Sequence, residues 1–288
     1  MCYDSSIWNE RQVNLVTKLF IKGSAKSYIG VMRKNNEDNY FLNGKYAEFD
    51  DTIQNACGFQ PFVSDGVFGI FDGMGGQSKG EFASLCAAKT LKKYSQAILN
   101  HSHNAVNDYI ADVNQQICQE MRRIRKQIGS TMAVLSVSNG TAFACNLGDS
   151  CIYHISGRYI TKLSRDHTVA EQLYRRNLLS EEEIRTDIRR HRLTHYLGVP
   201  ENNGQLFPHI CSNIRIHHGD MFLLCTDGVS DTLDEADIIE ILKTAQGKCH
   251  KAAEMIVSQA VKMGSTDNIT AIVLKAVRKW DKNFIFSK

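Results

Sequence analysis

Four aspartates stand at the ends of short apolar runs, or just before one, and carboxylates are the groups with which proteins hold hard divalent cations. Three of them have a glycine as neighbour; the four are Asp72, Asp149, Asp227 and Asp267. If these runs are strands whose ends share one edge of the core, the carboxylates converge there and repel one another unless a cation neutralises them. Oxygen ligands with no nearby His or Cys select Mg²⁺ or Mn²⁺ over Zn²⁺ or Cu²⁺. The pattern therefore predicts a magnesium or manganese site.

The alternative is that these positions are only turns. A single Asp-Gly pair is more often a turn than a metal ligand, because both residues tolerate turn conformations. Four acidic strand ends in one chain, together with the acidic pair Glu37-Asp38, favour the metal site.

Composition bounds the class of protein. The chain has 288 residues, with 34 Lys and Arg against 31 Asp and Glu, a formal net charge of +3. Hydrophobic residues make up 43% and charged residues 23%, which is typical of a globular protein and excludes disorder and a coiled coil. The even charge balance argues against nucleic acid or an anionic membrane as the main partner. No apolar run approaches the roughly 20 residues of a membrane span.

The start of the chain lacks the basic-then-apolar pattern of a signal peptide. The 9 cysteines are scattered, without a C-x-x-C pair or metal-ligand spacing, so we interpret them as reduced thiols. We expect a cytoplasmic, monomeric protein that binds neither nucleic acid nor membrane.

The elements that must position the aspartates change type along the chain. Apolar residues spaced three and four apart from Val106 to Ile128 predict an amphipathic helix, and a second helix is predicted over 79–99. After Gly129, short β-branched runs separated by Asn-Gly and Ser-Gly indicate consecutive hairpins of an antiparallel sheet; they cover 132–137, 141–147, 151–155 and 159–163.

The second half of the chain returns to helices. Segment 167–197 is charged and helical, with Ser180 and Glu183 spaced as a capping box. A strand over 221–226, helices near 234–245 and 248–263, and a last strand over 268–277 follow. Strands in hairpins with paired helices around them predict an α+β fold with antiparallel sheets. Residues 1–24 are weakly patterned and are expected to be an added edge element, and 50–65 reads as a long loop or hairpin tip.

Seven segments, taken together and in order, resemble the motifs of the metal-dependent protein phosphatase family, the protein phosphatase 2C type. They extend from about residue 28 to 275, and their spelling is most similar to the bacterial branch. The segments are Gly30–Asp38, Phe71–Gly76, Gly129–Thr131, Asn146–Ser150, Leu163–His167, Thr226–Asp231 and Gly264–Thr270.

The resemblance implies a sandwich of two antiparallel sheets flanked by pairs of helices, with two Mn²⁺ or Mg²⁺ ions at one end. It implies hydrolysis of phosphoserine and phosphothreonine in proteins that serine/threonine kinases modify. Residues 25–280 would be the catalytic domain, 167–197 a flap, 1–24 an extension and 281–288 a tail.

The resemblance also assigns roles residue by residue. Asp72 would bridge both ions and the Gly73 carbonyl would bind one of them, while Asp227 and Asp267 would bind the other. Asp149, with Asp227, matches a third metal site. Glu37 and Asp38 would hold waters of the metal shell, and Arg33 would grip the substrate phosphate.

Two positions depart from the family pattern. Met74 stands where many eukaryotic members have a histidine that is a proposed general acid, so the group that protonates the leaving oxygen is open. Cys151 stands where an arginine is commoner, and we interpret it as a packing residue. The basic cluster 189–192 in the flap is either a substrate-steering patch or a solvated surface.

Two other functions stay open at this stage. One is a dedicated phosphatase of the same fold that acts on a single regulator resembling an anti-sigma antagonist. The other is a non-catalytic module that binds phosphoproteins. Promiscuity towards phosphopeptides would separate the first from a general phosphatase, and absence of aryl phosphate hydrolysis with Mn²⁺ would favour the second.

Overall fold

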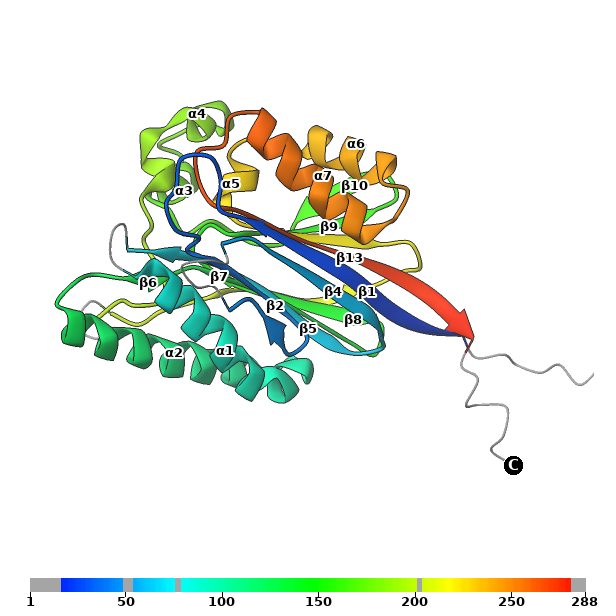
Figure 1. The fold of residues 1–288 in the computed structure, drawn as a ribbon, viewed down its shortest axis with the longest axis horizontal. Helices are drawn as coiled ribbons and strands as arrows, with labels where there is room; N and C mark the ends of the chain where they lie inside the picture. The colour runs from blue at the N-terminus through cyan, green and yellow to red at the C-terminus, as the bar shows by residue number, and fades with distance from the viewer. Residues whose placement is uncertain (1–16, 49–53, 76–78, 201–203, 281–288) are drawn as a thin grey trace, which may run out of the picture.

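Two antiparallel sheets packed face to face form the centre of the molecule (Figure 1). The computed structural model describes residues 17–48, 54–75, 79–200 and 204–280. One sheet has the strand order β10-β9-β12-β13-β1-β4; the other has β11-β8-β7-β5-β2-β3, with β6 paired to the end of β5. The bounds are β1 Thr17–Tyr28, β2 Asp38–Leu42, β3 Lys45–Tyr46, β4 Ala56–Val63, β5 Gly66–Met74, β6 Gly129–Ser130, β7 Met132–Ser138, β8 Thr141–Leu147, β9 Cys151–Ser156, β10 Tyr159–Lys162, β11 His209–Arg215, β12 Met221–Cys225 and β13 Ile269–Trp280.

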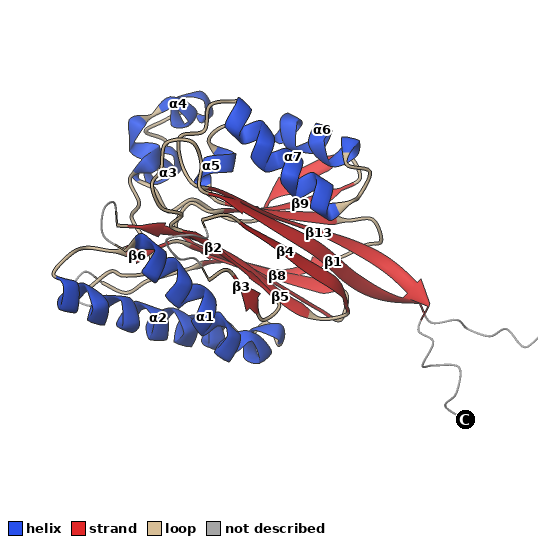
Figure 2. Ribbon diagram, in the orientation of Figure 1, coloured by secondary structure: helices blue, strands red, loops and turns tan. Residues whose placement is uncertain are grey.

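Helices cover both outer faces, which makes four layers (Figure 2). The pair α1 (Gly80–Leu99) and α2 (His103–Ile124) packs on the sheet that contains β5, β7 and β8. The pair α6 (Glu235–Thr244) and α7 (Cys249–Lys262) packs on the other sheet. A third apolar cluster, which includes Phe68 and Leu224, fills the space between the sheets. The predicted sandwich of two antiparallel sheets flanked by helix pairs is therefore confirmed.

Three short helices stand apart at one end of the sandwich: α3 (Val169–Arg175), α4 (Glu181–Thr186) and the 3₁₀ helix η1 (Ile188–His191). The predicted capping box of Ser180 and Glu183 starts α4. We call residues 167–197 the flap. The His167 amide donates to the Gly148 carbonyl at 3.0 Å, and Ser130 bridges to Leu197, so both ends of the flap are tied to the sandwich.

The hairpin prediction needs one correction. β7 and β8 pair in one sheet, whereas β9 and β10 pair in the other, so the hairpins do not belong to a single sheet. The chain crosses between sheets at 148–150, where Gly148 has φ of 106°. The hydrogen bonds within each hairpin are local. Which sheet a hairpin joins depends on contacts between residues far apart in the sequence, and the alternation of apolar and polar residues does not encode those contacts.

Two predictions near the start of the chain are wrong. Residues 17–24 belong to β1, an interior strand between β13 and β4, so the boundary predicted after residue 24 falls inside a strand. Small buried residues hid the pattern: Gly23 packs against Leu274, and Ser24 donates to the Gly58 carbonyl at 2.7 Å. Residues 1–16 lie outside the described residues.

The predicted loop over 50–65 contains a strand, β4. Pro61 suggested a loop, but β4 is the edge strand of its sheet, where a residue without an N–H is tolerated. Residues 49–53 of that prediction fall outside the described part of the chain.

Candidate metal centre

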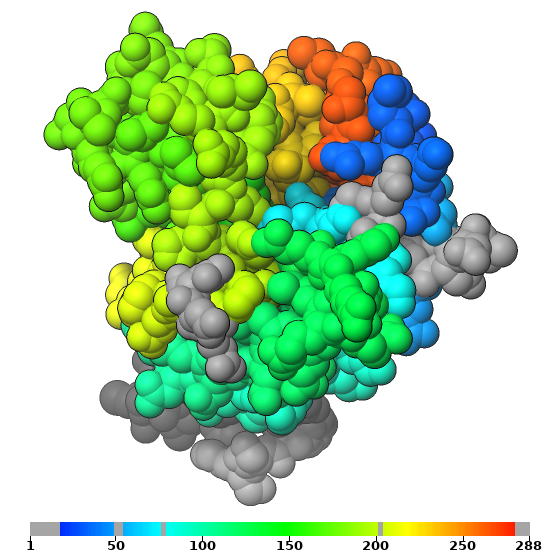
Figure 3. All heavy atoms as spheres, turned by 90° about the vertical axis from the view of Figure 1, so that its left-hand side faces the viewer, coloured from blue at the N-terminus to red at the C-terminus, as the bar shows by residue number. Residues whose placement is uncertain are grey.

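The four predicted aspartates line one cavity at the flap end of the sandwich, and they reach it from different elements. Asp72 comes from β5, Asp149 from the crossing after β8, Asp227 from the start of the short helix α5 (Asp227–Ser230), and Asp267 from the residue pair before β13. The cavity has a volume of about 180 Å³. Figure 3 shows this end of the molecule, where a hollow opens between the flap, in yellow-green, and the blue segment that follows β1.

Burial and, after it, mutual repulsion act on the carboxylates of this cavity. Burial, followed by the charge of Asp227, raises the pKa of Asp72 well above its usual range. Burial and Asp227 do the same to Asp149. Burial and the charge of Asp267 raise the pKa of Asp227. Carboxylates in such a group cannot all be ionised without a compensating positive charge.

One direct observation indicates that this cluster suits a divalent cation. The Asp227 Oδ1 atom is buried and has no hydrogen-bond partner among the described residues. A buried carboxylate oxygen without a donor is costly unless a proton or a cation binds it. Carboxylates predominate among the neighbouring groups that could bind a cation, and carboxylate oxygens suit Mg²⁺ or Mn²⁺.

Thr131 fixes the position of Asp72 relative to Asp149. The Asp72 amide donates to the Thr131 hydroxyl at 3.0 Å, and the Thr131 amide donates to the Asp72 carbonyl at 2.9 Å. The same hydroxyl lies 2.7 Å from that of Ser150, the residue after Asp149. Sequence reasoning assigned no role to Thr131, although it lies in one of the motifs that carry the family resemblance.

Glu37 lies at the wall of the cavity against the start of α1. Its carboxylate accepts the Gly80 amide at 3.1 Å, and its carbonyl accepts the Gly73 amide at 3.0 Å. Burial raises the pKa of Glu37 to about 7. The three backbones are so close that a Cβ on Gly73 would lie 2.3 Å from the Gly80 carbonyl oxygen, so glycine is required by close approach.

Asp38 lies behind the cavity and does not line it. Its carboxylate accepts hydrogen bonds from Thr226 at 2.9 Å and Thr270 at 2.7 Å. Burial raises its pKa, with the hydroxyl donors opposing the shift. Thr226 and Thr270 adjoin the strand ends that carry Asp227 and Asp267, so Asp38 ties these two strands together.

Arg33 stands half-exposed at the rim, where its guanidinium pairs with Asp267. Asn268 holds the loop that carries Arg33. Its side chain accepts the Glu37 amide at 2.8 Å and donates to the carbonyls of Ile29 at 2.7 Å and Asn35 at 3.0 Å. A positively charged group therefore overlooks the carboxylates from the open side.

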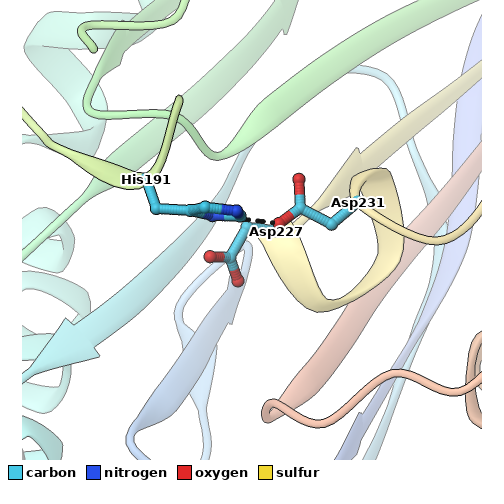
Figure 4. Close-up of side chains that lie close together, drawn as sticks. All are labelled: His191, Asp227 and Asp231. Carbon is cyan, nitrogen blue, oxygen red and sulfur yellow. Dashed lines mark ion pairs between the residues drawn. The ribbon is translucent and has the colours of Figure 1, made fainter. Parts of the chain in front are cut away.

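The flap contributes a residue that sequence reasoning left undecided. His191 lines the cavity, and its Nδ1 lies 3.3 Å from Asp231 (Figure 4). In the described part of the chain, His191, Asp227 and Asp231 each place a ligand atom within 4.8 Å of the others. Arg190 also pairs with Asp231, at 3.5 Å. Asp231 was not predicted, although it follows Asp227 by four residues, one helical turn, and caps the end of α5.

All the predicted site residues except Asp38 therefore line one cavity: Arg33, Glu37, Asp72, Gly73, Asp149, Asp227 and Asp267. Met74 lines it too. Their roles towards metal and substrate remain predictions.

Comparison with known families decides the membership of the chain. The family model "Protein phosphatase 2C" matches residues 50–262. The chain belongs to the protein phosphatase 2C family. The resemblance predicted from the sequence is thereby confirmed.

Individual relatives of this family are similar over most of the chain. The "Serine/threonine phosphatase stp" of Listeria monocytogenes is 27% identical over 253 residues, which cover 85% of this chain and 92% of that protein. A crystal structure of the Mycobacterium tuberculosis serine/threonine phosphatase PstP/Ppp superposes with a TM-score of 0.72 at 21% identity, covering 89% of this chain and 98% of that one. The catalytic domain of PstP "in complex with 2 Manganese ions" gives 0.71 at 21% identity, covering 90% and 100%.

No helix in the described part of this phosphatase 2C chain is long and apolar enough to cross a membrane.

Proposed function

We propose that this chain is a metal-dependent serine/threonine protein phosphatase that hydrolyses phosphoserine and phosphothreonine in proteins. The observation that carries the proposal is the convergence of four aspartates on one cavity, with a buried Asp227 oxygen that lacks a donor. The phosphatase names of the relatives and the two manganese ions in the PstP structure support it. The catalytic domain would comprise residues 17–280, because β1 is an interior strand.

The proposed metal ligands follow from the family pattern. Asp72 would bridge two cations, the Gly73 carbonyl would bind one of them, and Asp227 and Asp267 would bind the other. Asp149 would contribute to a third site with Asp227. Glu37 and Asp38 would orient water and ligands from the cavity wall and from behind it.

The chemistry that the bound ions supply is activation of water as a nucleophile and neutralisation of charge on the phosphoryl group. The residues of the chain bind the ions and the substrate and orient them relative to one another. Arg33 would leave Asp267 and bind two phosphate oxygens, because a guanidinium fork matches two oxygens of one phosphate. The chain need supply no nucleophile of its own, because phosphoryl transfer depends mainly on positioning and charge stabilisation.

Turnover with Mn²⁺ tests the proposal. The purified chain should release phosphate from phosphoserine and phosphothreonine peptides and from an aryl phosphate when Mn²⁺ is present, and EDTA should stop the release. Binding of the phosphopeptides without hydrolysis of either substrate would favour the phosphoprotein-binding module. Hydrolysis confined to one phosphoprotein would favour the dedicated phosphatase.

Arg33→Ala is expected to raise KM for phosphopeptides about tenfold or more, with a smaller change in kcat. The reason is the loss of a contact made in both ground and transition states. Arg33→Lys should recover only part of the loss, because an ammonium cannot grip two oxygens in a fixed plane. Steady-state kinetics of both variants measure the effect. Arg158→Ala, in the exposed turn between β9 and β10, serves as a control for lost positive charge. An unchanged KM in Arg33→Ala would remove Arg33 from the substrate site.

Met74→His is expected to raise turnover of phosphopeptides more than turnover of an aryl phosphate. A thioether has no proton to donate, and a serine leaving group needs protonation far more than a phenol does. General acid catalysis contributes roughly a hundredfold where it operates, so a gain of about tenfold is measurable even with imperfect placement. The ratio of the two rates, followed from pH 5.5 to 8, is the readout. If both substrates slow equally, Met74 only fills space beside the cavity.

A further inference from the structure

A second cavity adjoins the metal centre on the flap side and shares Asp149 and Asp227 with it. Its volume is about 180 Å³, and Lys162, Ser230 and Asp231 are among the residues that line it. The Lys162 ammonium donates to both oxygens of Asp166, at 2.7 and 2.8 Å. The Cys151 thiol donates to the carbonyl of Asp149, which lines the same cavity, at 3.3 Å. Cys151 therefore lies directly behind the cavity lining, although it is only 1% exposed.

Cys225 faces Cys151 across two neighbouring strands. The two residues are Cα partners in the antiparallel register of β9 and β12. Both side chains belong to the apolar cluster under α6 and α7, so they project from the same face of the sheet. Opposite residues in an antiparallel pair have Cα atoms roughly 4.5 or 5.5 Å apart. A disulfide needs about 4.4–6.8 Å between the two Cα atoms, and both spacings fall within that range.

We propose that Cys151 and Cys225 form a disulfide when a hydroperoxide enters the second cavity. The Cys151 sulfur attacks one peroxide oxygen and the O–O bond breaks, which yields a sulfenic acid on Cys151 and water or an alcohol. The Cys225 sulfur then attacks the sulfenic sulfur, the S–S bond forms and water leaves. Two electrons pass from the two sulfurs to the peroxide, and both thiol protons end in the released molecules.

In the described part of the chain, Cys151 and Cys225 are the two free cysteines that lie directly opposite each other on paired strands. Cys145, for comparison, belongs to the cluster under α1 and α2 on the other sheet. Cys57 is exposed, and its thiol accepts a hydrogen bond from Lys26 at 3.3 Å. Neither is opposite another cysteine in the strand pairings. Oxidation of these thiols would give mixed products rather than a defined bond within the chain.

The bond would act on the metal centre through short stretches of backbone. Cys151 is two residues after Asp149, and Cys225 is two residues before Asp227. A disulfide brings the two sulfur atoms to bonding distance and removes the thiol proton with which Cys151 donates to the Asp149 carbonyl at 3.3 Å. The Asp149 backbone loses this hydrogen bond, and the position of the Asp149 carboxylate in the cavity is no longer supported from the Cys151 side. The effect on turnover rests on the proposed phosphatase function, whereas bond formation does not.

Mass spectrometry and activity, measured on the same samples, test the proposal. The chain is incubated with increasing hydrogen peroxide, free thiols are alkylated, and the protein is digested with trypsin without reduction. Cys151 falls in the fragment 127–158 and Cys225 in 216–243. We expect these two fragments joined, and dithiothreitol should separate them. Because 127–158 also contains Cys145, the variant Cys145→Ala should still give the joined species, whereas Cys151→Ala should not.

Phosphate release should fall at least tenfold as the joined species accumulates and should return with dithiothreitol. The double variant Cys151→Ala/Cys225→Ala should keep its activity under the same peroxide. Absence of the joined fragments in the wild-type chain overturns the proposal, and so does their formation in Cys151→Ala. Full activity of the joined species would refute the coupling to the metal centre. A chain that forms the bond but never hydrolyses a phosphoester would refute the proposed function and leave the disulfide established.

Discussion

Asp72→Ala is expected to reduce metal-dependent turnover at least a thousandfold while leaving the chain folded. Asp72 is the carboxylate on which the charges of Asp227, Asp38, Asp267 and Asp149 all act, so it lies at the centre of the cluster. In the proposed role Asp72 bridges two cations, so its removal should cost the chain both of them. Two-metal activation is the main source of rate in the proposed reaction. A thousandfold corresponds to about 4 kcal/mol of transition-state stabilisation. Phosphate release from a phosphopeptide measures turnover, and circular dichroism of the same sample shows whether the chain is folded.

Two further variants sharpen this test. Asp72→Asn keeps the shape of the side chain and removes its charge, and it should lose nearly as much activity as Asp72→Ala. Asp108→Ala removes an exposed carboxylate of α2, far from the cavity, and should keep full activity. Retention of more than about a tenth of the activity in Asp72→Ala corresponds to a loss below about 1.4 kcal/mol and would contradict the assignment.

The metal-free chain is expected to lose stability as the pH rises from about 5 to 8. Folding raises the pKa of Glu37 from 4.5 to about 7, mainly through burial, and raises those of Asp72 and Asp227 as well. Between the unfolded and folded pKa values the native state binds more protons than the unfolded state, so the free energy of unfolding falls as pH increases. Glu37 alone would account for a loss of about 3 kcal/mol at about 1.4 kcal/mol per pKa unit.

Thermal unfolding of the EDTA-treated chain at pH 5 and pH 8 measures this loss. At about 2–4 °C per kcal/mol for a chain of this size, we expect Tm to be roughly 5–10 °C lower at pH 8. Saturating Mn²⁺ should close most of the gap, because a ligand that binds only the native state stabilises it and replaces the protons. Glu37→Gln should show a smaller gap than the wild-type chain. A Tm that rises with pH without metal would show that the carboxylates are not held in repulsion.

The sequence by itself identified the aspartates at the strand ends and the family. These signals are local. An apolar run followed by Asp-Gly can be recognised from a few neighbouring residues, and each family motif is likewise a short segment. The helices were equally accessible, because the spacing from Val106 onward specifies one buried face without reference to the rest of the fold. α2 ends at Ile124, and the buried Ile128 continues the apolar pattern outside the helix.

Only the tertiary structure decided which strands share a sheet and which side chains share the cavity. β1 pairs with β13 across more than 240 residues of sequence. The small buried residues of β1 give no alternation of apolar and polar side chains that would indicate an interior strand. Glu37 and Asp38 are adjacent acidic residues with nothing in the sequence to tell them apart, yet Glu37 lines the cavity and Asp38 is buried behind it. The reason is that successive residues of an extended chain point to opposite faces. His191 reaches Asp231 only because the flap folds back over the end of the sandwich. Local sequence specifies the element and its buried face, but long-range pairing brings the elements together, and that depends on the packing of the whole core.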